Sequence, residues 1–198
     1  MEADEALMRE LSGGRDSALN LLMERWQLPL RRFLYRYTQN EAEALDLAQE
    51  AFVRVYRNRD QFNPGMRFST WLFTIGVNLC RNRARWWRRH PSESLDGLPP
   101  VVSESAEGLR DENDPAGRLG AKEKAAAVRQ AVERLPHELR VVTLLFEFEE
   151  LSQAAIAAAL GCSVKAVEVR LYRARKLLRK SLGSLLEETS RGKSADGV

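Results

Sequence analysis

The sequence predicts an all-α protein made of two small helical domains, the second with a helix–turn–helix, joined by a flexible acidic linker. Three observations carry this prediction. Apolar residues recur at intervals of three and four along most of the chain, and no convincing run alternates as a half-buried strand would. A proline-, serine- and acid-rich stretch separates two helical blocks. The basic residues concentrate in those blocks.

The uneven charge distribution marks the domain boundaries. Residues 16–90 carry 13 Lys/Arg against 7 Asp/Glu, residues 91–117 carry 1 against 7, and residues 118–198 carry 15 against 10. Basic blocks of this kind suggest a polyanionic partner. We expect the following segments: an N-terminal extension at 1–15, a helical domain at 16–90, an acidic linker at 91–119, a helical domain at 120–186 and a disordered tail at 187–198.

The first block predicts helices over 17–38, 41–57 and about 69–90. We expect Pro29 to interrupt the first of them, because proline removes a backbone donor. In the second helix, Leu45 falls on the stripe expected to be buried. Asn63-Pro64-Gly65 predicts a loop over 58–68, after which Ser69 is expected to cap the long third helix.

The second block predicts helices over 118–134, 136–148, 152–160 and 164–186. Ser152 is expected to cap the third of these, and Gly161 can adopt the positive φ that a tight turn needs. Val164 and Val167 are expected to pack inward. Two short helices joined by such a turn, the second rich in cations, can place a helix in the major groove of DNA.

The position of each side chain on the last helix predicts its role. In a helix–turn–helix, the N-terminal residues of the second helix reach base edges and later cations meet phosphates. We therefore expect these residues near bases: Lys165, Glu168, Val169 and Arg173. Arg175, Lys176 and Arg179 are expected nearer the DNA backbone. The alternative is a packing domain whose basic face is merely solvated.

Several classes of protein are disfavoured by the sequence. The N-terminus has no apolar signal region and no stretch approaches the ~18 apolar residues of a membrane span, so we expect a cytoplasmic protein without membrane insertion. Cys80 and Cys162 match no metal-ligand spacing, so no metal or cofactor is expected. His90 and His137 are isolated, and no nucleophile–base set or phosphate loop suggests an enzyme.

The C-terminal residues resemble a known family. The pattern Leu135-Pro136-x-x-x-Arg140, Leu151-Ser152, Ile156-Ala157-x-x-Leu160-Gly161-x-Ser163 and Val167-x-x-Arg170-Leu171-x-Arg173-Ala174-Arg175 is similar to region 4 of bacterial sigma factors, especially the extracytoplasmic-function (ECF) class. The resemblance implies reading of the −35 promoter element and contact with the β flap of RNA polymerase. It implies these −35 residues: Ser163, Lys165, Glu168, Val169, Arg170, Arg173, Arg175 and Lys176.

This region departs from the family pattern at the reading positions. Ala155 stands where the family usually has an acid, and Lys165 replaces a common Gly. Glu168 and Val169 replace a usual Lys or Arg followed by Ser or Thr. A glutamate facing bases favours the cytosine amino group. We therefore expect the fold to be kept and the promoter sequence to differ.

A string in the first block, Asp46-x-x-Gln49-Glu50-x-Phe52-x-x-x-Tyr56-Arg57, resembles sigma region 2.2. The resemblance implies docking on the β′ clamp of core RNA polymerase. The implied docking residues are Asp46, Gln49, Glu50, Val53 and Arg57. Periodicity by itself favours a plainer reading, in which Glu50 and Arg54 form an i,i+4 surface pair worth ~0.3 kcal/mol.

The next segment, from Phe62 to Leu72, resembles the part of ECF sigma factors that opens and reads the −10 element. Melted DNA exposes bases, and aromatics, amides and short polar groups can capture them. The implied −10 residues are Asn63, Arg67, Phe68, Ser69, Thr70, Asn78, Arg81, Asn82 and Arg85. Trp86 and Trp87 either stack on nucleic acid or pack in the protein.

Both resemblances together predict an ECF sigma factor that directs core RNA polymerase to promoters, recognises the −35 and −10 elements, and melts DNA. The implied partners are core polymerase, promoter DNA and an anti-sigma factor, since members of this class are commonly held inactive by one. An alternative is a free-standing helix–turn–helix regulator that binds duplex DNA without polymerase. An adaptor without DNA contact is disfavoured by the basic face of 164–180.

Overall fold

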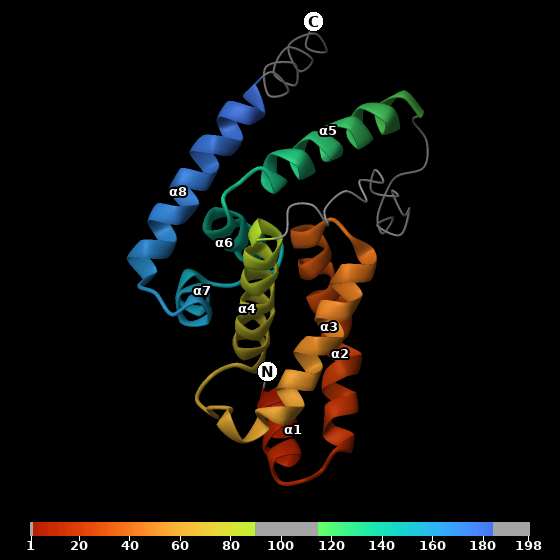
Figure 1. Ribbon diagram of the computed structural model, residues 1–198, viewed down its shortest axis with the longest axis vertical. Helices are drawn as coiled ribbons and strands as arrows, with labels where there is room; N and C mark the ends of the chain where they lie inside the picture. The colour runs from red at the N-terminus through yellow and green to blue at the C-terminus, as the bar shows by residue number, and fades with distance from the viewer. Residues whose placement is uncertain (1, 90–114, 184–198) are drawn as a thin grey trace, which may run out of the picture.

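The structure is a computed structural model, and it describes residues 2–89 and 115–183. Within those residues every regular element is a helix (Figure 1), which confirms the all-α prediction. The elements are α1 (Glu2–Ser12), α2 (Ser17–Thr38), α3 (Glu41–Arg57), a short 3-10 helix η1 (Arg59–Gln61), α4 (Phe68–Arg89), α5 (Pro115–Glu133), α6 (His137–Glu147), α7 (Gln153–Leu160) and α8 (Val164–Ser181).

Helices α1 to α4 form the first bundle around an aromatic core. Phe33 and Phe73 are fully buried, and their rings meet edge to face with centroids 5.5 Å apart. Helix α1 belongs to this bundle, because Met8 and Leu11 are also fully buried. The predicted N-terminal extension at 1–15 is therefore largely a helix that helps to build the core.

Two local predictions for the first bundle are wrong. Helix α2 continues through Pro29 without the expected interruption. Leu22, about two turns before Pro29, and Leu30, the residue after it, are both fully buried, and this packing keeps the helix continuous across the missing donor. Helix α4 begins at Phe68, so Ser69 lies in its first turn and is not its cap.

Helices α5 to α8 form the second bundle, which contains the expected helix–turn–helix. The Ser152 hydroxyl accepts a hydrogen bond from the Ala155 N–H (3.2 Å), which confirms it as the cap of α7. Gly161 has φ 61° at the turn, where a side chain would be strained. Ser163 caps α8 in the same way, through the Ala166 N–H (3.2 Å).

The predicted boundaries of the linker and tail fall largely outside the described residues. Helix α5 begins at Pro115, so the last part of the segment predicted as linker 91–119 is helical. The rest of that linker and the tail predicted at 187–198 lie outside what the structure describes.

The two bundles pack directly against each other (Figure 1). Helix α4 contacts α6 and α7, and α2 contacts α6. The buried apolar residues of both bundles form one continuous core. Cys80 of α4 is fully buried at this junction near Arg140 of α6, and burial raises the pKa of its thiol. We call this packed arrangement the closed form.

Candidate nucleic-acid interface

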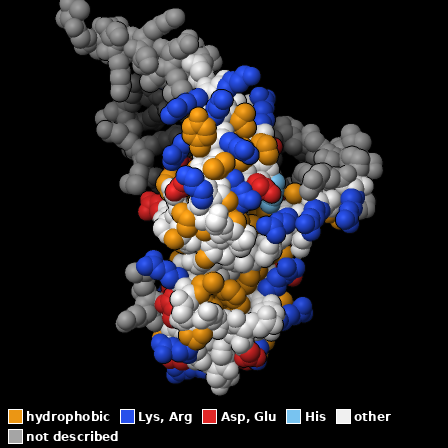
Figure 2. All heavy atoms as spheres, turned by 90° about the vertical axis from the view of Figure 1, so that its left-hand side faces the viewer, with side chains coloured by type: hydrophobic (Ala, Val, Ile, Leu, Met, Phe, Trp, Pro, Cys, Tyr) orange, Lys and Arg blue, Asp and Glu red, His pale blue; other side chains and the backbone are white. Residues whose placement is uncertain are grey.

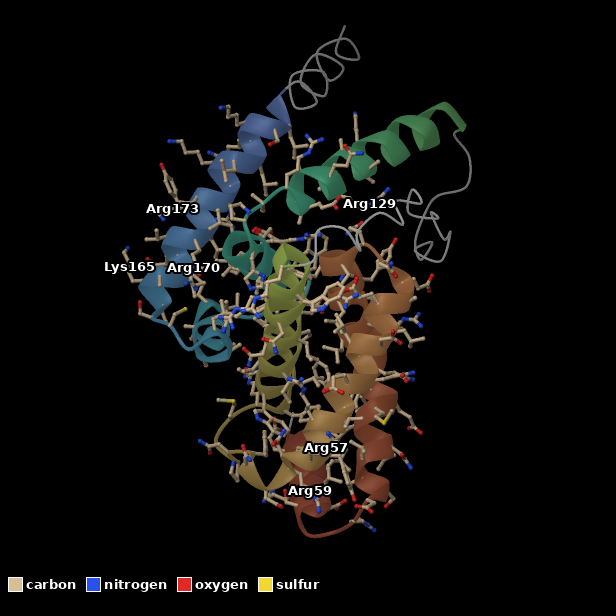
Figure 3. The ribbon with its side chains drawn as sticks, viewed as in Figure 1. Arg57, Arg59, Arg129, Lys165, Arg170 and Arg173 are labelled. Atoms are coloured by element: carbon tan, nitrogen blue, oxygen red, sulfur yellow. The ribbon has the colours of Figure 1, made fainter. Side chains whose placement is uncertain are left out.

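The exposed face of α8 is the strongest candidate for a DNA-binding surface. Lysine and arginine side chains crowd the upper part of the face seen in Figure 2, where α8 lies. Lys165 and Arg173 project away from the rest of the molecule (Figure 3), and both are exposed. Arg173 and Lys176 form no ion pair with any residue of 2–89 or 115–183. Their charges are therefore available to a polyanion.

The buried side of α8 fixes the orientation of that face. Val167 is fully buried, and Leu171 and Ala174 are 3% and 1% exposed. Val164, which was expected to pack with them, is 42% exposed, because the cap residue Ser163 starts the helix at the rim of the bundle. Packing of this kind leaves the opposite side of the helix free to enter a groove.

Two of the expected −35 cations hold α8 on α6 in this arrangement. A guanidinium nitrogen of Arg170 lies 3.0 Å from the Glu138 carboxylate, and another lies 3.5 Å from the Cys162 sulfur. Arg175 pairs with Glu147 at 3.1 Å. Because Arg170 is turned into these contacts, it differs from Arg173 on the open face. Its partners give it a structural role that spacing did not indicate.

The reading end of α8 carries a charge pair and an aromatic residue. Lys165 donates to Glu168 at 2.8 Å, and this hydrogen bond raises the pKa of the lysine ammonium. Tyr172 is 70% exposed between Glu168 and Lys176, and together they line an open groove that reaches Gln153 of α7. Tyr172 was not among the residues predicted to face DNA, although its position one turn after Glu168 indicates that face.

The expected −10 residues divide between the surface and the core. Asn63 and Arg67 are exposed in the loop before α4. The Asn63 side chain accepts a hydrogen bond from the Gly65 N–H (2.9 Å), which shapes the turn. Phe68 is fully buried and Thr70 is 4% exposed, so these two side chains support the loop and do not reach the surface.

Beyond the first turn of α4, most of the residues expected to contact the −10 element lie on one exposed face of the helix. Asn78, Asn82 and Arg85 are exposed on successive turns. Arg81 is half-buried, because it lines a small cavity with residues of the second bundle, among them Arg170. A residue expected at the −10 element and one expected at the −35 element therefore share one cavity in the closed form.

Of the two tryptophans near the end of α4, Trp86 and Trp87, the structure describes the side chain of Trp86. Trp86 is 37% exposed, and the Arg83 guanidinium lies over its ring at 4.8 Å from the centroid. Such an exposed, cation-paired indole can contact nucleic acid or protein. The side chain of Trp87 lies outside the described residues.

The outer face of α3 is a mixed polar and apolar surface. Asp46, Gln49 and Arg57 are exposed, and Val53 is 41% exposed. Leu45, expected in the core, is 44% exposed beside them at i,i+4 spacing from Gln49. The prediction that Leu45 is buried is wrong, because Ala44 and Ala48 supply the buried stripe in its place.

Glu50 on this α3 face forms the surface pair that periodicity suggested. Its carboxylate lies 2.8 Å from the Arg54 guanidinium, and both side chains are partly exposed. Arg57 and Arg59 lie near the lower end of the molecule, whereas Lys165 and Arg173 lie higher, at its left-hand edge (Figure 3). The α3 surface and the α8 surface are thus separate.

The described residues contain neither a candidate metal site nor a candidate membrane span. No group of three or more His, Cys, Asp or Glu side chains in 2–89 and 115–183 is placed to hold a metal ion. In the same residues each helix is too short or too polar to cross a bilayer.

Comparison with known proteins finds the same two regions in the same order. The model of the family described as Sigma-70 region 2 matches residues 22–90, and that of Sigma-70, region 4 matches residues 125–178. The two matches correspond to the first bundle without α1 and to most of the second bundle.

Relatives align over almost the whole chain. The RNA polymerase sigma-H factor of Pseudomonas aeruginosa is 34% identical over 189 residues, which are 94% of this chain and 97% of that protein. The ECF RNA polymerase sigma-E factor of Escherichia coli is 32% identical over 184 residues, 92% of this chain and 96% of that protein. Among solved structures, CnrH in complex with the cytosolic domain of CnrY is 29% identical, with a TM-score of 0.67 over 92% of this chain and 98% of that one.

Proposed function

The chain belongs to the sigma-70 family and, within it, to the ECF class. We propose that separate surfaces of the chain bind core polymerase, the −10 element and the −35 element during transcription initiation. The chain directs core RNA polymerase to promoters, and the polymerase performs the chemistry. It acts where the polymerase acts, in the cytoplasm.

The α3 face is the docking surface for the β′ clamp in this proposal. Its implied contacts are Asp46, Gln49, Glu50, Val53 and Arg57, and Leu45 is added because it extends the apolar centre. An apolar centre within a rim of charges of both signs is typical of a protein interface. The same composition would be unsuitable for a nucleic-acid surface, where cations dominate.

The loop 58–67 and the exposed side of α4 read and hold the melted −10 strand. Asn63 and Arg67 in the loop and Asn78, Asn82 and Arg85 on α4 supply amides and guanidiniums for this purpose. Phe68, Ser69 and Thr70 shape the start of α4. Arg81 joins the strand only after the closed form has opened, since it now lines a cavity with the second bundle.

The open face of α8 reads the −35 element. Lys165, Glu168, Val169, Tyr172 and Arg173 are the proposed base-reading group, and Lys176 contacts phosphate. Arg170 and Arg175 keep α8 on α6, with Ser163 as its cap. Through its second bundle the chain also contacts the β flap.

A single observation carries the proposal: both sigma regions are present, in order, in a chain whose relatives align from end to end. A free-standing helix–turn–helix regulator needs only the second bundle. It gives no reason for a first bundle that matches region 2 or for a mixed docking face on α3.

The closed form cannot engage a promoter with both bundles. The −10 and −35 elements are roughly 25 base pairs apart, which is about 85 Å at about 3.4 Å per base pair. Here Arg81 and Arg170 line one small cavity. We therefore infer that binding of core polymerase separates the bundles, and that the closed form is the state of the free protein.

We also propose a protein partner of the anti-sigma kind. CnrH, which shares this fold over almost its full length, has been solved with the cytosolic domain of CnrY. A partner that favours the closed form would compete with polymerase by linkage, because the two bind different arrangements of the bundles.

In vitro transcription tests the main proposal. Core polymerase is incubated with genomic DNA fragments, with and without the full chain, and RNA start sites are mapped. We expect new starts that appear only with both proteins and that depend on both promoter elements. Tight specific DNA binding by the chain alone, with no redirected starts, would favour the free-standing regulator.

A further inference from the structure

Helix α1 contacts both ends of the loop that joins α3 to α4. At the start of the loop, the Ser12 hydroxyl donates to the backbone carbonyl of Arg59 (2.9 Å). At its end, a carboxylate oxygen of Glu5 accepts a hydrogen bond from the backbone N–H of Phe68 (3.0 Å). Helix α1 thus holds the loop at two points.

Helix α1 is itself firmly seated, so Glu5 is presented in a defined place. Met8 and Leu11 are fully buried in the first bundle. The Asp4 carboxylate accepts hydrogen bonds from the Arg25 guanidinium (2.7 Å) and from the indole N–H of Trp26 (3.1 Å). These contacts fix the turn of α1 that carries both acidic side chains.

Helix α1 holds the backbone of Phe68 directly and its side chain indirectly, through Trp26 of α2. The Phe68 ring packs edge-on against Trp26, with centroids 6.2 Å apart, and Trp26 is in turn held by Asp4. Its N–H is held by Glu5. Arg67, the exposed residue expected at the −10 element, is the immediate neighbour of this doubly fixed position.

Glu5 supplies a hydrogen-bond acceptor that the first turn of α4 lacks. The first N–H groups of a helix have no acceptor within the helix, and Ser69 is one residue too late to cap the first of them. A carboxylate at this point makes a charge-assisted hydrogen bond and interacts favourably with the helix dipole. Without it, the first turn of α4 and the end of the loop would fray.

We propose that α1 is a brace for the loop 58–67 and that Glu5 is a positioning residue for −10 recognition, acting through the Phe68 amide. This inference rests on the −10 role proposed for the loop. It assigns a task to residues that neither the match to region 2, which begins at residue 22, nor the sequence patterns included.

The test compares Glu5→Ala and Glu5→Gln with Glu10→Ala in reconstituted holoenzyme. Glu10 lies on the same helix, and its carboxylate pairs with Arg15 and with no other residue of 2–89 or 115–183, so it is the matched control. Transcription is measured on a promoter mapped with the wild-type chain and on versions with one −10 or one −35 base changed. We expect Glu5→Ala to reduce −10 discrimination roughly fivefold, the loss typical of one helix cap, with −35 discrimination unchanged. Glu5→Gln, which keeps an acceptor, should lie between.

A second measurement separates this inference from the proposed function. Hydrogen exchange on the free chain should show a faster Phe68 amide in Glu5→Ala and an unchanged one in Glu10→Ala. Unaltered −10 discrimination in Glu5→Ala would overturn the proposal, and so would an equal loss at both promoter elements together with weaker core binding. If the wild-type chain directs no starts, the proposed function fails and the recognition role fails with it. The exchange result would still decide whether Glu5 holds the loop.

Discussion

The phenol oxygen of Tyr37 lies 2.7 Å from Nδ1 of His137, and the two residues belong to different bundles. Their rings meet edge to face with centroids 5.6 Å apart. The Arg140 guanidinium lies over the Tyr37 ring and donates to the Arg36 carbonyl (3.3 Å). Beside them, Arg36 pairs with Glu149 at 3.1 Å. This cluster joins α2 to α6 and to the residues that follow α6, and we expect it to stabilise the closed form.

Tyr37→Phe should shift the chain toward the open form. Loss of one buried hydrogen bond costs about 1 kcal/mol, or roughly a fivefold change in the closed-to-open ratio. Energy transfer between dyes on the two bundles measures that ratio. Apparent affinity for core polymerase should rise with it, since a larger fraction of the chain is competent to bind.

The matched control for this substitution is Tyr56→Phe, because the Tyr56 hydroxyl bonds Asp16 within the first bundle (3.3 Å). It should leave the dye signal unchanged. Equal signals for Tyr37→Phe and wild type would show that the Tyr37–His137 bond does not hold the bundles together.

The closed form should be favoured at low pH because of Glu149. Burial raises the pKa of this carboxyl to about 7, and Arg36 and Arg32 oppose only part of the rise. An exposed carboxyl in the open form would titrate near its ordinary 4.5. Between these values the closed form binds more protons, so its advantage is full below 4.5 and is lost as the pH rises through about 7.

The same dye-labelled chain tests this pH dependence. The closed fraction should fall as the pH is raised from 5 to 8, with pH 4.5 to 7 as the window set by Glu149. Glu149→Gln should remove this component of the pH dependence. An unchanged slope in Glu149→Gln would contradict the assignment.

Arg173→Ala should reduce the free energy of binding to the −35 element by about 1–3 kcal/mol, the usual cost of losing a base-reading arginine, and −35-dependent transcription should fall with it. Binding to core polymerase should be unaffected, because the substitution lies on the open face of α8. Promoter output measured on templates with and without the −35 element checks this. Arg129→Ala, an exposed cation of α5, is the control. Equal output from wild type and Arg173→Ala would argue against α8 as the recognition helix.

Glu50→Arg should reduce core binding roughly tenfold, because it breaks the pair with Arg54 and reverses the charge on the proposed docking face. Folding should be nearly unchanged, as expected for a surface substitution. Co-purification with core polymerase and thermal unfolding together measure both effects. Glu10→Arg, at a side chain of α1 that is exposed to about the same degree, is the control. Undiminished co-purification of Glu50→Arg would exclude this face as the docking site.

Local chemistry made much of the second bundle predictable. Ser152 and Gly161 mark the start and end of α7 because a hydroxyl caps a helix and a glycine accepts a positive φ wherever they occur. Helical periodicity likewise predicted a basic face on α8, but it did not separate the cations that face solvent from those that pair with α6. Local chemistry gave the wrong prediction at Pro29, where packing of Leu22 and Leu30 in one core outweighs a single missing hydrogen bond.

The sequence by itself determined most of the helices, the charge of the α8 face and the family to which the chain belongs, because these depend on spacings of a few residues and on ordered motifs. Only the tertiary structure decided which cations face solvent. It turned Arg170 toward Glu138, buried Phe68, exposed Leu45, and brought Glu5 to the start of α4 and Tyr37 to His137. Those contacts join residues dozens of positions apart, and periodicity along one helix carries no information about what a distant helix will place against it.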